Sequence, residues 1–123
     1  MNSFQGAFPI LYVDDVERAI AFYASTFGFE PTYRWDEDGA TVFAFLELEP
    51  LGIGVARRSE ENGDRAFALW LDGDDVDDAA KRLRAAGATE VLPPTDQPWG
   101  ERMCSFVDGN GHLVHVGGRR RES

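Results

Sequence analysis

Trp99 lies in the stretch QPWGERMCSF, residues 97–106, between a proline and a glycine. Pro98 fixes its own φ and Gly100 permits backbone angles that other residues avoid, so this turn can present the indole ring in one orientation. A ring held in this way loses little freedom on binding. It could hold a planar or cationic molecule by stacking or cation–π attraction worth roughly 0.5–2 kcal/mol. The alternative is that Trp99 packs as a structural plug on its own subunit or on a dimer partner.

Few other residues have the spacing of a reactive site. Three carboxylates, Asp36, Glu37 and Asp38, stand together, but the Gly39 that follows them favours a hydrated turn. The sequence has no glycine-rich phosphate loop, no C-x-x-C motif and no local nucleophile signature. The single cysteine, Cys104, cannot form an intrachain disulfide and is expected to be a small buried residue. These features favour binding over covalent catalysis.

The chain is acidic, with 22 Asp and Glu against 12 Lys and Arg and a formal net charge of −10. Such a charge repels nucleic acid and anionic membranes and attracts cations, although it also serves solubility alone. No signal-peptide pattern opens the sequence, and no run of about 18 apolar residues occurs in it. We therefore expect a cytoplasmic protein that binds neither nucleic acid nor membranes.

The elements that must position Trp99 follow a plan that occurs twice. Residues 8–28 are typical of a strand, an Asp14-Asp15 turn and a helix that ends at Gly28. Residues 67–87 repeat this plan, with Asp74-Asp75 in the place of the first acidic pair and Gly87 one residue short of the corresponding glycine. Strand-like segments follow both helices: ATVFAFLELE and GIGVARR, then RMCSFVD and HLVHV. We predict one α+β domain, residues 1–123, built from two similar units.

Alternation along the strands of the first unit divides its side chains between two faces. Phe8, Ile10 and Tyr12 should face away from the helix. In TVFAFLE one face collects Thr41, Phe43, Phe45 and Glu47. A face that mixes aromatic rings with a carboxylate fits a half-open concave surface, and a two-sided core with Glu47 at its edge fits the pattern nearly as well.

The segments VDDVERAIAFY, FGFE and DQPWGERMCSFVDGNGHLVHV resemble the vicinal oxygen chelate superfamily, which holds glyoxalase I, ring-cleaving dioxygenases and the bleomycin-resistance binding proteins. The resemblance covers nearly the whole chain, and the last segment looks most like the bleomycin-resistance branch. It implies two βαβββ modules, residues 7–58 and 65–117, and a basic tail, residues 118–123. Their curled sheets would form a cup, usually completed by homodimerisation. The usual Asp-Pro-x-Gly-Asn turn is here DGNGH, residues 108–112, which predicts a looser hairpin loop.

Enzymes of this superfamily mostly use a divalent metal held by three or four His, Glu or Gln side chains. By resemblance the first ligand position falls on Phe8, and the corresponding position of the second module falls on Ala66 or Phe67. GIGVARR offers no ligand, and only His115 matches a ligand position with a ligating residue. One imidazole does not hold a catalytic divalent ion, so we expect no metal and no other cofactor. We expect His115 to line the cup, bonded to a backbone group or carboxylate, and His112 to be an exposed turn residue.

We predict a metal-free binding protein of the bleomycin-resistance type. It would be a homodimer that sequesters an aromatic, cationic small molecule, such as an antibiotic, in a cleft at the dimer interface. The predicted ligand-binding residues combine aromatic rings, carboxylates and one histidine: Trp99, Trp35, Tyr33, Phe43, Phe45, Glu47, Trp70, Asp36, Asp38, Phe106 and His115. The phenylalanines are included although a strand phenylalanine is more often a core residue.

Other functions stay open on the sequence alone. A metal-dependent glyoxalase or dioxygenase-type enzyme, a lyase or an oxidoreductase, would need metal ligands in addition to His115, at positions other than Phe8 and Ala66. A metal-free isomerase or epimerase of the same superfamily would need a buried acid or base. A dimeric interaction domain would have its cup filled by Phe8, Tyr12, Trp70 and Phe45.

Overall fold

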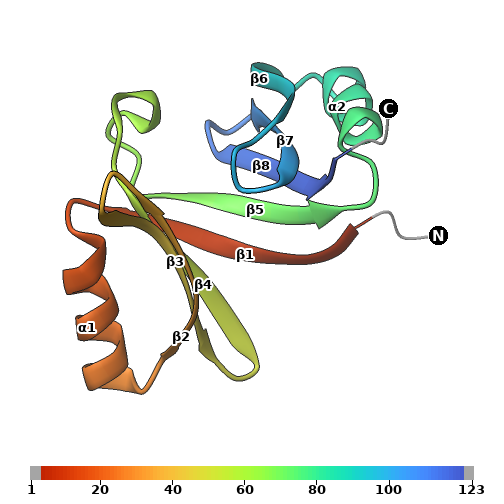
Figure 1. The fold of residues 1–123 in the computed structure, drawn as a ribbon. Helices are drawn as coiled ribbons and strands as arrows, with labels where there is room; N and C mark the ends of the chain where they lie inside the picture. The colour runs from red at the N-terminus through yellow and green to blue at the C-terminus, as the bar shows by residue number, and fades with distance from the viewer. Residues whose placement is uncertain (1–3, 121–123) are drawn as a thin grey trace. The chain divides into compact units, whose positions relative to one another are not determined.

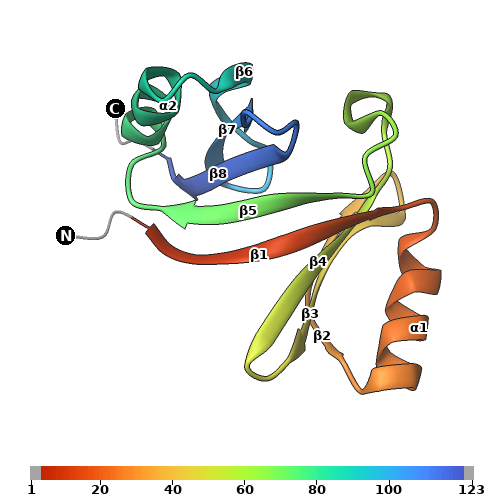
Figure 2. The same cartoon turned by 180° about the vertical axis from the view of Figure 1, so that it is seen from behind.

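The computed structural model describes residues 4–120, drawn in Figure 1 and, from behind, in Figure 2. These residues form eight strands, two α-helices and one short 3-10 helix. The first module comprises β1 (Phe4–Val13), α1 (Val16–Phe27), β2 (Glu30–Glu37), β3 (Ala40–Leu48) and β4 (Leu51–Arg57). The 3-10 helix η1 (Glu60–Asn62) follows. The second module comprises β5 (Phe67–Gly73), α2 (Val76–Ala85), β6 (Thr89–Asp96), β7 (Glu101–Val107) and β8 (Leu113–Arg119).

The chain divides into two compact units. One is Phe8–Ala68, and the other runs from Leu69 onward and includes the N-terminal residues up to Ala7. β1 therefore contributes its first residues to the second unit and the rest to the first. The predicted α+β class with two βαβββ modules is confirmed.

The sheet of the first unit has the strand order β2-β3-β4-β1. β1 and β4 are parallel, and the other neighbouring pairs are antiparallel. α1 lies against one face of this sheet, beside β3 and β4 in Figure 1. The core between helix and sheet consists of buried apolar side chains from α1, β3 and β4: Val16, Ile20, Ala44, Leu46, Ile53 and Val55.

Both ends of α1 are capped, and the cap at Gly28 is the one that the sequence predicts. The Asp15 carboxylate accepts a hydrogen bond from the Arg18 backbone N–H at 3.1 Å, which satisfies one of the donors that a helix start leaves without a partner. Gly28 ends the helix in the left-handed conformation with φ of 86°, which glycine adopts without steric cost. These caps fix the turn from β1 into α1 and the exit towards β2.

The sheet of the second unit has the order β5-β8-β7-β6, with β5 and β8 parallel and the other pairs antiparallel. α2 begins at the Asp75 cap, whose carboxylate accepts from the Asp78 N–H at 3.1 Å. The helix ends at Ala86, and Gly87 follows with φ of 89°. The core under α2 mirrors that of the first unit: Val76, Ala79, Ala80, Cys104, Phe106 and Val116.

The boundaries differ in detail from the predicted ones. β1 starts at Phe4, three residues before the predicted start of the first module, and β8 extends through Arg119 into the segment predicted as a basic tail. The rest of that tail, residues 121–123, lies outside the described residues. The turn at residues 108–112 holds because Asp108 Oδ1 accepts the N–H groups of Asn110 and His112 at 2.8 and 2.9 Å. Neither helix within residues 4–120 is long and apolar enough to span a bilayer.

Candidate functional site

Two tryptophans of the second module each donate the indole N–H to a carboxylate two residues further along the chain. Trp70 Nε1 lies 2.9 Å from Asp72 Oδ1 on β5, where residues two apart point to the same side of a strand. Trp99 Nε1 lies 2.8 Å from Glu101 Oε1 at the start of β7. Trp99 reaches its acid from the turn before β7, where Gly100 has φ of 102°. Each ring is thus held beside a negative charge.

The face of the second sheet that α2 does not cover carries a row of side chains from three strands. Trp70 pairs in register with His115, and His115 pairs with Ser105. The Trp70 and His115 ring centroids are 6.0 Å apart, and Ser105 Oγ lies 2.7 Å from His115 Nδ1. His115 was expected to bond a backbone group or a carboxylate, but the group that it meets through Nδ1 is a hydroxyl.

Burial sets the charge of His115. Removal from water disfavours the imidazolium and lowers the pKa of His115 to about 4, so the ring is neutral at physiological pH. A neutral ring has one acceptor nitrogen, and Ser105 is 4% exposed, so its hydroxyl is enclosed with the histidine. His115 therefore acts here as a neutral polar group and adds no positive charge to this face.

Glu101 is the acid of this face whose protonation is shifted. Burial raises the pKa of Glu101; the hydrogen bond from Trp99 lowers it, and the negative charge of Asp72 raises it further. The two carboxylates of the two indole pairs are therefore close enough to repel each other. A positive charge placed beside them would relieve both the repulsion and the loss of hydration.

The first module presents aromatic rings on the face that α1 does not cover. Phe8 meets Phe45 edge-on with ring centroids 4.8 Å apart, and Tyr33 lies 6.1 Å from Phe43 by the same measure. Ala44 lies between Phe43 and Phe45 in the sequence, and Leu46 follows Phe45. Both Ala44 and Leu46 are buried on the α1 side of the sheet. The predicted alternation is therefore confirmed, and Glu47 follows on β3 as an exposed residue.

The acidic end of β2 forms the turn that its sequence predicts. Asp38 and Gly39 have φ of 51° and 80° and join β2 to β3. The Asp36 carboxylate accepts from Thr41 Oγ1 at 2.7 Å across this turn. Trp35 Nε1 donates to Glu37 Oε2 at 3.1 Å, so the third tryptophan repeats the pairing with an acid two residues on. Asp36 and Asp38 thus take part in the structure of the turn.

The prediction for Phe106 is wrong. This side chain has no exposed surface and packs under α2 with Cys104, on the opposite side of β7 from Ser105. It cannot touch a ligand on the other face. The expectation for Cys104 is confirmed, since it is fully buried and its desolvation raises the pKa of the thiol to about 11.

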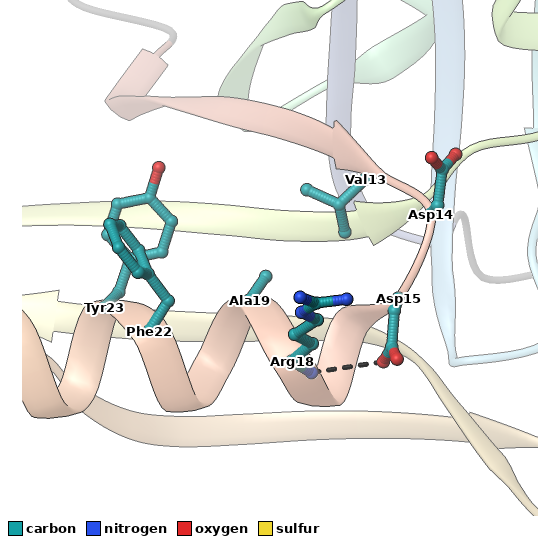
Figure 3. A pocket seen from close by; sticks show the side chains of 7 residues that line it. All are labelled: Val13, Asp14, Asp15, Arg18, Ala19, Phe22 and Tyr23. Carbon is teal, nitrogen blue, oxygen red and sulfur yellow. Dashed lines mark hydrogen bonds between the residues drawn. The ribbon is translucent and has the colours of Figure 1, made fainter.

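A surface groove of about 370 Å³ lies in the first module beside the start of α1 (Figure 3). Figure 3 shows the Asp15 carboxylate turned to the Arg18 N–H, so this acid is engaged in capping the helix. None of the predicted ligand-binding residues lines the groove, which is formed by Val13, Asp14, Asp15, Arg18, Ala19, Phe22 and Tyr23. The candidate site is therefore assigned to the tryptophan-bearing face of the second module.

Residues 5–116 match the family model of the Glyoxalase/Bleomycin resistance protein/Dioxygenase superfamily. The chain belongs to this superfamily. An uncharacterized protein of Mycobacterium bovis is 30% identical over 126 aligned positions, which span 93% of this chain and 83% of the relative. The sequence-based assignment to the superfamily is confirmed by these matches, which do not single out the bleomycin-resistance branch.

Several solved structures share the fold of this chain at low sequence identity. The NAD-dependent benzaldehyde dehydrogenase structure from Legionella pneumophila has a TM-score of 0.77 and 18% identity, over 94% of this chain and all (100%) of that one. Methylmalonyl-CoA epimerase from Mycobacterium tuberculosis has a TM-score of 0.75 and 18% identity, over 98% of this chain and 91% of that one. Likeness at this level of identity concerns the fold alone.

The donor set of residues 4–120 does not fit the divalent metal that superfamily enzymes mostly use. Across residues 4–120, no three His, Cys, Asp or Glu side chains gather into a group that could hold an ion. Phe8, at the first ligand position, packs its ring against Phe45. His115, at the last ligand position, has Nδ1 in contact with the Ser105 hydroxyl. A metal ion bound to His115 would need further protein ligands.

Proposed function

We propose that this protein binds a small aromatic, positively charged molecule without a metal or another cofactor, as proteins of the bleomycin-resistance type do. The observation that carries the proposal is the presence of two indole–carboxylate pairs in the second module, Trp70–Asp72 and Trp99–Glu101. Each pair holds an indole ring beside a carboxylate; Trp99 is part-exposed, and Trp70 is 8% exposed. Stacking and charge pairing are the two interactions that an aromatic cation can make most strongly.

The electrostatics of the pairs support a cationic guest. Burial and the Asp72 charge raise the pKa of Glu101, so its ionised form lacks the solvation that it would have in water. A guest cation would supply the missing countercharge at that place. The net charge of −10 would also draw cations to the protein at low ionic strength. Sequestration of this kind needs no bond-making step.

The proposal includes a homodimer in the cytoplasm, with the ligand in a cleft at the subunit boundary, as the resemblance to the bleomycin-resistance branch implies. A reduced, buried Cys104 is compatible with that compartment. Size-exclusion chromatography with light scattering measures the assembly directly. A monomer at micromolar concentration, with or without ligand, would remove the dimer from the proposal.

Isothermal titration calorimetry with bleomycin, phleomycin and ethidium tests the ligand class. We expect micromolar dissociation constants for these flat cations and none for a neutral aromatic such as naphthol. Trp99→Ala should weaken binding about tenfold, as the loss of one stacking partner does. Phe22→Ala is the matched control, since Phe22 is 53% exposed on α1 in the other module. A panel in which no flat cation releases heat would contradict the proposal.

A metal-free isomerase is the second candidate, and the raised pKa of Glu101 is the observation that favours it. A carboxylate with a raised pKa is a stronger proton acceptor than an ordinary one, so Glu101 could act as a general base. Exchange of the substrate C–H proton with D₂O, followed by NMR with methylmalonyl-CoA as a probe, separates the two functions. Exchange that depends on Glu101 and survives chelators would favour the isomerase.

A further inference from the structure

The indole ring of Trp70 occupies the place where a side chain of residue 117 would stand. A Cβ built on Gly117 would lie 3.0 Å from Trp70 Cε2 and closer still to Cζ2 and Cη2. Real Cβ atoms essentially never come within 3.0 Å of other atoms. Trp70 pairs in register with His115, so its ring extends along β8 over the residue two positions further on. Trp70 therefore keeps its position only because residue 117 has no side chain.

The first module uses the same arrangement twice. A Cβ on Gly52 would lie 2.8 Å from Phe45 Cε2, and one on Gly54 would lie 3.0 Å from Phe43 Cε1. Both rings stand on β3 and both glycines on the neighbouring strand β4. Three of the predicted ligand-binding aromatics are thus seated over glycines. Since aromatic side chains over strand glycines recur in both modules, the seating is a property of these faces and not an accident of one contact.

We propose that Gly117 is a positioning residue for the ligand site, because it fixes the Trp70 ring where its N–H reaches Asp72, the carboxylate whose charge acts on Glu101. This inference rests on the proposed function for its ligand, and on the packing alone for the position of the ring. The indole N–H lies 2.9 Å from Asp72 Oδ1 in this position. An alanine at 117 would displace the ring and lengthen that hydrogen bond.

Two other glycines of the second module separate this role from an ordinary structural one. A Cβ on Gly109 would meet nothing within 4 Å, so Gly109→Ala should be neutral. A Cβ on Gly118 would collide with the backbone carbonyl oxygen of Gly73, so Gly118→Ala should damage the sheet whatever stands at position 70. Gly117→Ala should damage only a protein that carries the Trp70 ring.

The first experiment uses the protein without ligand. In the W35F/W99F background Trp70 is the remaining tryptophan, and it is 8% exposed. We expect Gly117→Ala to shift its fluorescence emission to the red and to reduce its near-UV circular dichroism, while Gly109→Ala leaves both unchanged. A Gly117→Ala spectrum that superimposes on that of the parent would overturn the proposal.

The second experiment keeps the proposal testable if Gly117→Ala folds poorly. Thermal unfolding is compared in the wild-type and W70A backgrounds. We expect Gly117→Ala to lower Tm in the presence of Trp70 and to have no effect in W70A, while Gly118→Ala lowers Tm in both. An equal loss from Gly117→Ala in both backgrounds would overturn the proposal.

The third experiment adds bleomycin and ethidium as probes. We expect Gly117→Ala to weaken their binding about tenfold and Gly109→Ala to leave it unchanged. Equal affinity in the wild type and in Gly117→Ala would overturn the role in the site. If neither probe binds the wild-type protein, the proposed function fails with them, and the spectroscopic and unfolding results still decide whether Gly117 positions Trp70.

Discussion

The Trp99 indole N–H donates a 2.8 Å hydrogen bond to Glu101 Oε1, and the same carboxylate is half-buried and close enough to feel the charge of Asp72. The hydrogen bond fixes the ring and the acid relative to each other. Burial and the neighbouring charge make the ionised acid unfavourable, and the bond offsets only part of that cost. The pair is therefore ordered in advance for a guest that brings a positive charge and a flat surface.

Replacing Glu101 with glutamine should stabilise the fold and weaken the binding of cations. The amide keeps an oxygen for the Trp99 hydrogen bond but carries no charge to desolvate. Because the folded-state pKa of Glu101 is raised, this acid favours folding at pH values below its unfolded pKa, and that contribution is lost as the pH rises through the folded pKa. At pH 7 we expect the Tm of E101Q to exceed that of the wild type by about 2–5 °C, with the gain vanishing below pH 4. Differential scanning calorimetry measures it.

Glu90→Gln is the control for that experiment, because the Arg84 guanidinium lowers the pKa of Glu90. Arg84 Nε donates to Glu90 Oε1 at 3.1 Å, and Arg84 Nη2 donates to Glu90 Oε2 at 2.6 Å. The glutamine variant loses this ion pair, so its Tm at pH 7 should be equal to or lower than that of the wild type. A higher Tm for E90Q, or an unchanged Tm for E101Q at both pH values, would contradict the conclusion that burial of the ionised Glu101 carboxylate lowers the stability of the fold.

Acid should destabilise the protein through His115. Its pKa falls from 6.5 to about 4 on folding, so the unfolded chain takes up a proton across that interval and the folded chain does not. The stability contributed by the neutral ring is complete above pH 6.5 and is lost as the pH falls towards 4. The full loss corresponds to about 3 kcal/mol in the free energy of unfolding.

Urea unfolding of the wild type and of His115→Gln at pH 7.5 and pH 5 isolates the contribution of His115 to the pH dependence of stability, since the other groups titrate equally in both proteins. The wild type should lose about 1–2 kcal/mol more than the variant between the two values. NMR of the His115 ring protons gives an independent measurement. A midpoint near 6.5 in the folded protein would show that the ring is hydrated and that the prediction is wrong.

Truncation of Phe106 should affect stability and not binding. Phe106 is fully buried under α2, so Phe106→Ala should cost about 3–5 kcal/mol in the free energy of unfolding. Phe22→Ala, at a residue 53% exposed, should cost less than about 1 kcal/mol. Phe106→Leu keeps most of the volume and allows calorimetry at full folding. A loss of ethidium affinity in Phe106→Leu without a change in fold would show that Phe106 contributes to ligand binding.

The sequence predicts most of the fold because its local signals agree with each other. Asp15 and Gly28 mark the two ends of α1, and both act as caps in the structure. Alternation separates Phe45 from Leu46, and the structure buries Leu46 in the core with α1 and places Phe45 on the other face, against Phe8. The repetition of the acidic turn before Val76 predicts the second helix in the same way. These signals depend on neighbours in the chain and need no knowledge of the sheet.

The site depends on relations that one strand does not encode. Ser105 meets His115 because the 108–112 turn sets the register between β7 and β8. The error at Phe106 has the same origin, since alternation separates it from Ser105 but does not say which of the two faces the helix. The acids at 72 and 101 could have been found, because each stands two residues after a tryptophan. Residues two apart bring an indole N–H to a carboxylate where the backbone is extended, as between Trp70 and Asp72. Trp99 and Glu101 meet because the backbone turns at Gly100, which has φ of 102°.

Removal of metal ions should leave ligand binding unchanged. Residues 4–120 contain no group of three acidic, histidine or cysteine side chains that fits an ion, and Nδ1 of His115 is already in contact with Ser105. Protein dialysed against EDTA should therefore bind ethidium and bleomycin as tightly as before, and titration with Mn²⁺, Ni²⁺ or Zn²⁺ should not tighten it. Elemental analysis should find divalent metal only in substoichiometric amounts. One equivalent of a divalent ion that survives dialysis in the wild type and is absent from His115→Ala would show that the histidine ligates a metal, and binding by rings and carboxylates alone would no longer account for the site.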